Sequence, residues 1–298
     1  MFSLFKAKEI WGIIHNMRKF ILTILAFLFL AQSSYALCFS DFCKEEAAIK
    51  RVLNSQVKYA NRNNLEKFIN TYDKKYISAD GFNLDTFSNV IEDIWNTYNN
   101  LKYKIEIDDI TIKNDTATAK LIEKTAAKVE LSKTYKGDLN STANTIYHLK
   151  KNKAGKWKVI SDEILDETTT IFYGNAQDLD VKLTGPDCIP ANTDYTAMLE
   201  FEPPRGVLAI ASIAVDLAEY PQKPTKEVFR TLPDDNILER IFTSNDKNLN
   251  EFIVASIGLT QSQITESSVN LSLVGFGYVI KRVNVIKESS GGENVKNK

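Results

Sequence analysis

Histidine is nearly missing from this sequence, with two in 298 residues, and cysteine occurs only three times. Zinc centres are built from closely spaced cysteine and histidine side chains, so this composition excludes an ordinary zinc centre. Positive charge is not in excess, because 37 Lys and Arg face 38 Asp and Glu. A protein that binds nucleic acid needs clustered basic residues to displace counterions from phosphates. We therefore expect no nucleic-acid partner and, without a recognisable motif, no cofactor.

Long apolar runs are also scarce, and the one near the N-terminus has the features of an export signal. Arg18 and Lys19 precede an apolar run over residues 20–31, and small residues stand before a cut after Ala36. The run is shorter than the roughly 20 apolar residues that cross a bilayer as a helix. We predict a cleavable signal peptide over residues 1–36, with Met17 as an alternative start. The protein would then be bacterial, exported to the periplasm or secreted, and not an integral membrane protein.

The three cysteines follow this leader, at Cys38, Cys43 and Cys188. In an oxidising compartment one disulfide is expected, and two pairings stay open: Cys38 with Cys43, or either of these with Cys188. A further alternative makes Cys38 a lipid-modified N-terminus, although Leu37 is not the small residue that such processing usually requires.

Residues 44–168 combine helical and strand periodicities. Apolar residues recur at spacings of three and four over 44–61, 64–72 and 84–98, which predicts three helices. From Tyr103 the apolar residues alternate with charged ones, and long segments separated by turn residues follow as far as Asp166. A helical block followed by an antiparallel sheet predicts an α+β domain.

Four segments of this region resemble the nuclear-transport-factor-2-like superfamily, which includes the SnoaL-like polyketide cyclases and the ketosteroid isomerases. They are the helix end at residues 59–66, the run over 68–81, the hairpin over 110–119 and the closing Gly155–Ile160. The resemblance implies a cystatin-like cone, in which a curved antiparallel sheet wraps over helices and leaves an apolar pocket. It also implies that a homodimer can form through the sheet. The residues expected to line the pocket are Gln56, Tyr59, Tyr72, Trp95 and Trp157.

The resemblance also raises the question of catalysis. In the ketosteroid isomerase branch a carboxylate moves a proton beside a carbonyl, while a tyrosine and a protonated acid hold the oxyanion. By its distance from the second helix, Asp80 falls near the place of that base. The matching tyrosine is absent, because Gln56 occupies the corresponding turn and Tyr59 lies almost a full turn away. The plainer interpretation is that Asp80 and Gly81 form a turn.

His148 is the second weak catalytic candidate, because it is the only histidine after the leader. Strand alternation puts it on one face with Ile146 and Lys150, opposite Tyr147 and Leu149. It is therefore either a proton carrier in the pocket or a solvated residue on the strand.

Residues 172–288 have short apolar segments punctuated by glycine and proline, which predicts an all-β sandwich as a second domain. Residues 207–217 are predicted as a strand, although their alanines also suit a helix, and residues 275–277 are predicted as a break between two strands. Carboxylates beside polar turns at 236–240 and 248–251 lack calcium-loop spacing, so we expect no metal. Residues 289–298 are predicted to be a disordered tail.

Three functions remain open at this point. The first is an exported, non-catalytic binding protein, whose cone holds a small apolar molecule or a protein partner and whose second domain contacts an envelope protein. The second is a pocket enzyme of the isomerase or dehydratase type that uses Asp80. The third is a structural or assembly factor of the envelope.

Overall fold

The structure is a computed structural model. It describes residues 42–98, 100–223, 226–247, 249–264 and 269–286. The predicted leader, Cys38 and the predicted tail lie outside the described residues. The chain divides into two compact units between Arg51 and Val52, and the sheets and the cavity described below belong to the second unit. Within the described residues, no helix is both long and apolar enough to cross a bilayer.

The predicted helices are confirmed. One covers residues 42–60, and α2 (Leu65–Ile69) and α3 (Leu84–Thr97) follow. Asparagine caps two of them: Asn64 Oδ1 accepts from the Lys67 amide at 3.0 Å, and Asn83 Oδ1 accepts from the Thr86 amide at 2.9 Å. Such caps satisfy amides that have no partner within the helix, so they set where α2 and α3 begin.

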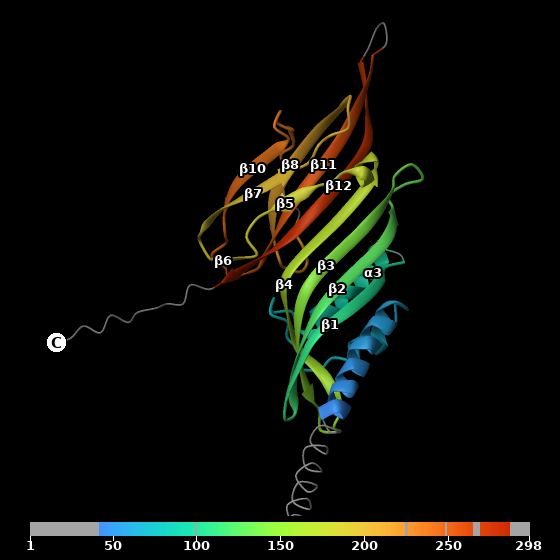
Figure 1. Cartoon of the computed structure of the whole chain (residues 1–298), viewed down its shortest axis with the longest axis vertical. Coiled ribbons are helices and arrows are strands. Elements are labelled where there is room, and N and C mark those ends of the chain that lie inside the picture. Colours follow the sequence, from blue (N-terminus) through green and yellow to red (C-terminus); the bar gives the residue numbers. More distant parts are fainter. Residues whose placement is uncertain (1–41, 99, 224–225, 248, 265–268, 287–298) are drawn as a thin grey trace, which may run out of the picture. The chain divides into compact units, whose positions relative to one another are not determined.

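We call residues 42–174 the first half of the chain and the residues that follow the second half. Four long antiparallel strands form the sheet of the first half: β1 (Lys102–Lys113), β2 (Thr116–Glu130), β3 (Lys136–Lys151) and β4 (Trp157–Gly174). The register between β3 and β4 shifts at two places, between Asn144 and Thr145 and between His148 and Leu149. Such bulges bend a sheet, and this sheet curves around α3 (Figure 1). The first half therefore has the expected cystatin-like arrangement of helices against a curved antiparallel sheet.

The sheet does not end at β4. It continues through β12 (Val269–Ile286), β11 (Glu251–Ile264), β8 (Val207–Leu217) and β9 (Arg230–Thr231), in the order β1-β2-β3-β4-β12-β11-β8-β9 (Figure 1). β4 crosses the boundary predicted between residues 168 and 172, because the β-branched run Thr168–Thr170 favours a strand. With β6 (Cys188–Pro190), which pairs with β12 outside this order, the two halves of the chain share one nine-stranded sheet.

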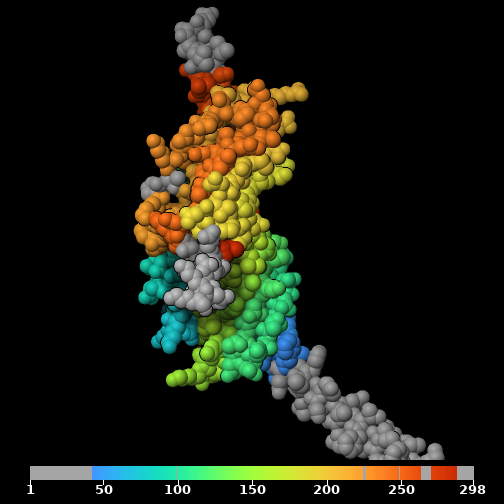
Figure 2. Space-filling view, turned by 90° about the vertical axis from the view of Figure 1, so that its left-hand side faces the viewer, coloured from blue at the N-terminus to red at the C-terminus, as the bar shows by residue number. Residues whose placement is uncertain are grey.

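A smaller sheet belongs to the second half alone. Its strands are β10 (Ile237–Thr243), β7 (Asp194–Glu200) and β5 (Lys182–Thr184), and orange β10 lies beside the yellow segment that contains β7 in Figure 2. A short 3-10 helix, η1 (Asn175–Asp178), follows β4, and β6 (Cys188–Pro190) pairs in parallel with β12. The buried side chains of both sheets share one core, which includes Ala197, Leu199, Leu238, Ile213, Ile257 and Val283.

The predicted break at residues 275–277 is wrong, because β12 runs through it without interruption. The glycines serve close packing instead of a turn. A Cβ atom on Gly277 would lie 2.1 Å from a ring carbon of Phe172, and one on Gly275 would lie 2.5 Å from the Ala176 amide nitrogen. The Phe172 ring and the backbone of η1 can lie this close to β12 because β12 has no side chains at these two positions.

Candidate functional site

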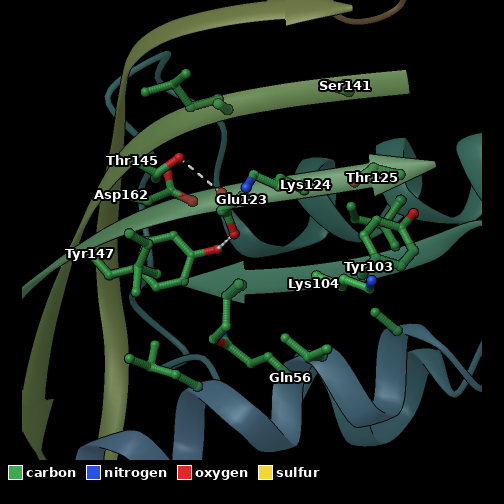
Figure 3. A pocket seen from close by; sticks show the side chains of 18 of the residues that line it. Gln56, Tyr103, Lys104, Glu123, Lys124, Thr125, Ser141, Thr145, Tyr147 and Asp162 are labelled. Atoms are coloured by element: carbon green, nitrogen blue, oxygen red, sulfur yellow. Dashed lines mark hydrogen bonds between the residues drawn. The ribbon is translucent and has the colours of Figure 1, made fainter. Parts of the chain in front are cut away.

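A cavity of about 260 Å³ lies between the helices and the inner face of the sheet in the first half. Most of its lining is apolar or aromatic, and polar side chains gather on the sheet side (Figure 3). The apolar and aromatic members are Leu53, Val57, Ala60, Phe68, Tyr72, Phe87, Ile91, Trp95, Tyr103, Ile105, Leu121, Ala143, Tyr147 and Ile164. This composition is typical of sites for small organic molecules.

The aromatic wall is held rigidly. Phe68 on α2 packs edge-on against Trp95 on α3, with the ring centroids 5.7 Å apart, and its ring centroid lies 6.2 Å from that of Phe87. Trp95 Nε1 donates to the Tyr103 hydroxyl at 2.9 Å, which fixes the orientation of the indole. A ligand would therefore meet a preformed surface of rings.

Glu123 projects from β2 into the cavity, and two hydroxyls converge on it (Figure 3). Thr145 Oγ1 donates to Glu123 Oε2 at 2.8 Å, and the Tyr147 hydroxyl donates to Oε1 at 3.0 Å. Burial raises the pKa of Glu123, and these two hydrogen bonds act in the opposite direction because they stabilise the ionised carboxylate.

Asp162 on β4 lies near Glu123 (Figure 3). It accepts a hydrogen bond from the Tyr76 hydroxyl at 2.9 Å. Burial is the main reason that its pKa rises to about 6. The negative charges of Glu123 and Asp80 raise the pKa further, whereas the hydrogen bond from Tyr76 and the charge of Arg282 lower it. Asp162 therefore changes its charge near neutral pH while facing the cavity.

Glu167 is the third carboxyl at the cavity, and the bulge in β4 brings it there. Asn144 pairs with Asp166 and Thr145 with Ile164, which leaves Leu165 as the extra residue. Because this residue reverses the alternation of β4, Ile164 and Glu167 both line the cavity. Burial raises the pKa of Glu167, and the charge of Arg282 acts against that shift.

Two buried polar groups at the cavity have no hydrogen-bond partner within the part of the chain that the structure describes: the Gln56 amide nitrogen and the Tyr72 hydroxyl. Burial, followed by the charges of Asp162 and Glu123, raises the pKa of Tyr72 well above its usual value. Tyr147 acts on Tyr72 in the opposite direction and lowers its pKa, but the Tyr147 hydroxyl itself donates to Glu123. Tyr72 thus stays neutral and can either donate or accept a hydrogen bond.

The five predicted pocket residues lie in two places. Gln56, Tyr72 and Trp95 line the cavity, whereas Tyr59 and Trp157 are not among its described lining residues. Tyr59 is half-buried, and Trp157 is buried with the Lys151 ammonium 5.3 Å from its ring centroid.

Asp80, the predicted catalytic base, binds groups of the second half. Its Oδ1 accepts from Arg282 at 2.5 Å and from the Asn250 amide at 2.6 Å, and it is not among the described residues that line the cavity. His148 also lies elsewhere: it is half-buried on β3, with Nδ1 3.5 Å from the Thr118 hydroxyl. Neither residue shares the cavity with Glu123 and Asp162.

The sequence reasoning missed the acids of the sheet wall, although one signal was available. Ala117, Ala119 and Leu121 alternate along the inner face of β2, and Glu123 continues their register. A charged residue at an apolar position of a strand indicates a function or a buried partner.

The cysteines and the predicted polar turns do not form a site in the described residues. Cys43 and Cys188 are exposed free thiols, and no cluster of residues suited to a metal ion occurs there. Glu251 is buried and satisfied, because its carboxylate accepts from the Tyr195 hydroxyl at 3.0 Å and from the Asn245 amide at 2.6 Å. It anchors the preceding turn.

The chain is similar to known proteins in structure only. No protein-family model and no curated protein matches the chain. Bd1075 of Bdellovibrio bacteriovorus is a similar solved structure, with 16% identity over 42% of each chain and a TM-score of 0.35, so the chain spans less than half of its length. A protein of unknown function with a cystatin-like fold from Nostoc punctiforme has 14% identity over 40% of this chain and 88% of its own, with a TM-score of 0.33.

A nuclear-transport-factor-2-like protein of unknown function from Pseudomonas putida has 13% identity over 41% of this chain and 86% of its own, with a TM-score of 0.30. The solved structures that this chain resembles thus include nuclear-transport-factor-2-like and cystatin-like proteins, in agreement with the resemblance of residues 44–168.

Proposed function

We propose that the first half binds a small, largely apolar molecule that carries a hydrogen-bonding group. The observation that carries this proposal is the pair of unpartnered buried groups, the Gln56 amide and the Tyr72 hydroxyl, at an apolar cavity. A buried polar group without a partner costs about 1–3 kcal/mol of stability. A ligand that forms hydrogen bonds with both groups would remove this cost.

The size and walls of the cavity agree with this class of ligand. At about 260 Å³ it lies just below the roughly 300 Å³ at which pockets for drug-sized molecules begin, so the ligand is small. The aromatic wall would take the apolar body of the ligand, while Gln56 and Tyr72 would fix its orientation.

The proposal extends to the rest of the chain. The leader directs the protein out of the cytoplasm, to the periplasm or the medium. The second half, with its shared core between two sheets, would act as a β-sandwich domain that contacts an envelope protein, and a homodimer would form through the first half. These assignments are supported by the sequence patterns and the fold class.

Proton transfer in the same cavity is a second candidate function. Asp162 favours it, because a carboxyl with a pKa raised to about 6 can both accept and release a proton at neutral pH. This candidate moves the base from Asp80 to Asp162, since Asp80 is held by Arg282 and Asn250.

Native mass spectrometry of the protein purified from an expression host tests binding. We expect a retained small molecule that is lost on denaturation. Ala143→Phe, which fills the cavity from β3, should abolish retention, whereas Thr142→Phe on the exposed face of the same strand should not. A bare polypeptide mass for the unmodified protein, or equal retention by both variants, would count against the proposal.

A further inference from the structure

The charge of the cavity specifies the class of ligand further. This inference rests on the proposed function. Three carboxyls line one small space: Glu123, Asp162 and Glu167. Within the described residues none of them forms a salt bridge. The charge of Arg282 lowers the pKa of Asp162 and of Glu167, but its Nη2 donates to Asp80.

The basic residues of the lining lie at its exposed side. Lys104 and Lys124 are both exposed, and the Lys124 ammonium is 2.7 Å from the carboxylate of Glu106, which also faces solvent. Among the described residues the acids inside the cavity therefore have no direct ion pair, and Arg282, whose charge lowers the pKa of Asp162 and Glu167, is itself held by Asp80.

In the hydrogen bonds inside the cavity, the carboxyls of Glu123 and Asp162 are the acceptors. Thr145 and Tyr147 donate to the two oxygens of Glu123, and Tyr76 donates to Asp162. A ligand that approaches the remaining lone pairs must therefore bring hydrogen-bond donors or positive charge.

The aromatic residues of the lining suit the same kind of ligand. Trp95 and Phe87 lie on α3, and Tyr103 lies on β1. The face of an aromatic ring carries negative electrostatic potential, and a cation within about 6 Å of such a ring is attracted to it. Rings and carboxylates of the lining would together surround a positive group.

We propose that the ligand of this cavity is an organic cation: an amine or a quaternary ammonium group on an apolar body that also carries an acceptor for the Gln56 amide nitrogen, which can only donate. Its charged group lies between Glu123 and Asp162, and its body packs against the aromatic wall. A neutral carbonyl compound, which would need protonated carboxyls as donors, is the alternative that the test separates.

The pH dependence of binding has opposite signs for the two ligand classes. Asp162 loses its proton as the pH rises through about 6, so a cation binds more tightly above that pH and a carbonyl acceptor binds less tightly. The groups that act on Asp162 in this range are Tyr76, Tyr72, Glu123, Asp80 and Arg282.

Two isosteric probes isolate the charge: phenyltrimethylammonium and tert-butylbenzene, which differ in replacing a charged nitrogen by carbon. NMR chemical-shift titrations of the purified protein at pH 7.5 should give a dissociation constant at least about tenfold lower for phenyltrimethylammonium. That advantage should shrink at pH 5 as Asp162 becomes protonated.

Asp162→Asn should weaken phenyltrimethylammonium binding about tenfold without affecting tert-butylbenzene. Glu123→Gln, which keeps one acceptor oxygen for either Thr145 or Tyr147, provides a second variant. Asp108→Asn, on the exposed face of β1, removes the same charge outside the cavity and should change neither constant. Circular dichroism checks the fold of each variant.

Each outcome decides the inference. Tighter binding of tert-butylbenzene, or cation binding that is insensitive to both cavity variants, would overturn the cation assignment and leave the binding function intact. Binding of neither probe would also overturn it, while the proposed function is judged separately by the molecule that mass spectrometry finds in the purified protein.

Discussion

The junction between the two halves pairs its buried polar groups with one another, whereas the cavity has two buried polar groups without a partner among the described residues. At the junction, Arg282 donates to Asp80 at 2.5 Å and to Asn284 at 2.8 Å, and Asn250 binds the same oxygen of Asp80. In the cavity, the Gln56 amide has no partner within the described residues. The paired groups of the junction connect the two halves, whereas the unpaired groups beside the cavity are the basis of the proposed binding function.

The largest expected effect tests the junction. Arg282 has a side chain that is 2% exposed, and Asp80 would be left as an uncompensated buried charge by Arg282→Met. We expect this variant to lose about 3–5 kcal/mol of unfolding free energy in urea at pH 7.

Two further variants sharpen this test. Arg62→Met, at an exposed arginine, should change stability by less than about 0.5 kcal/mol. The double variant Asp80→Leu with Arg282→Met should recover much of the loss, because the lone charge is gone. If Arg282→Met alone is as stable as the parent, the ion pair between Arg282 and Asp80 does not stabilise the junction.

The second prediction concerns the pH dependence that Asp162 imposes. Its pKa is raised from 3.8 to about 6, so the folded state binds more protons than the unfolded state between these values. Stability must therefore fall as the pH rises through this window, by about 2–3 kcal/mol from this group. Asp162→Asn should lack this contribution, so its stability relative to the parent should increase between pH 4 and pH 6.5. Parallel stability profiles for the two proteins would contradict the assigned environment of Asp162.

The third prediction tests the close contact between β4 and β12. Gly277→Ala places a Cβ atom 2.1 Å from the Phe172 ring and 2.8 Å from the Ile171 carbonyl oxygen, so one strand must move. We expect a loss of about 1–3 kcal/mol in urea unfolding. Gly258→Ala on β11, whose Cβ would meet the Ile210 side chain at 3.1 Å, should lose less. Equal losses would mean that the contact with Phe172 has no special role.

The sequence predicts those elements of the fold that depend on local periodicity. The helices and most long strands follow from apolar periodicity, and β8 forms as a strand despite its alanines because neighbouring strands bury them. The glycines of β12 misled the prediction, because glycine signals both a turn and close packing. Only the partner strand, with Phe172 on it, distinguishes the two.

The candidate site was predictable on its helical side only. Gln56, Tyr72 and Trp95 come from regular helices or the turn after α2, where spacing gives direction. The acids of β4 follow bulges that reverse strand alternation, so counting along the chain does not show which way Glu167 faces. The pairing of Asp80 with Arg282 joins residues 202 positions apart and leaves no local signal.

The smallest expected effect tests the central claim most directly. Gln56→Leu removes the unpartnered amide and keeps the apolar volume, while Asn54→Leu changes an exposed position of the same helix as a control. In protein refolded to remove any bound molecule, Gln56→Leu should gain about 1 kcal/mol of unfolding free energy. In protein purified under native conditions, the same variant should lose the small molecule seen by mass spectrometry. A Gln56→Leu variant that is less stable and still retains the molecule would contradict the claim that the unpaired groups of the cavity serve binding.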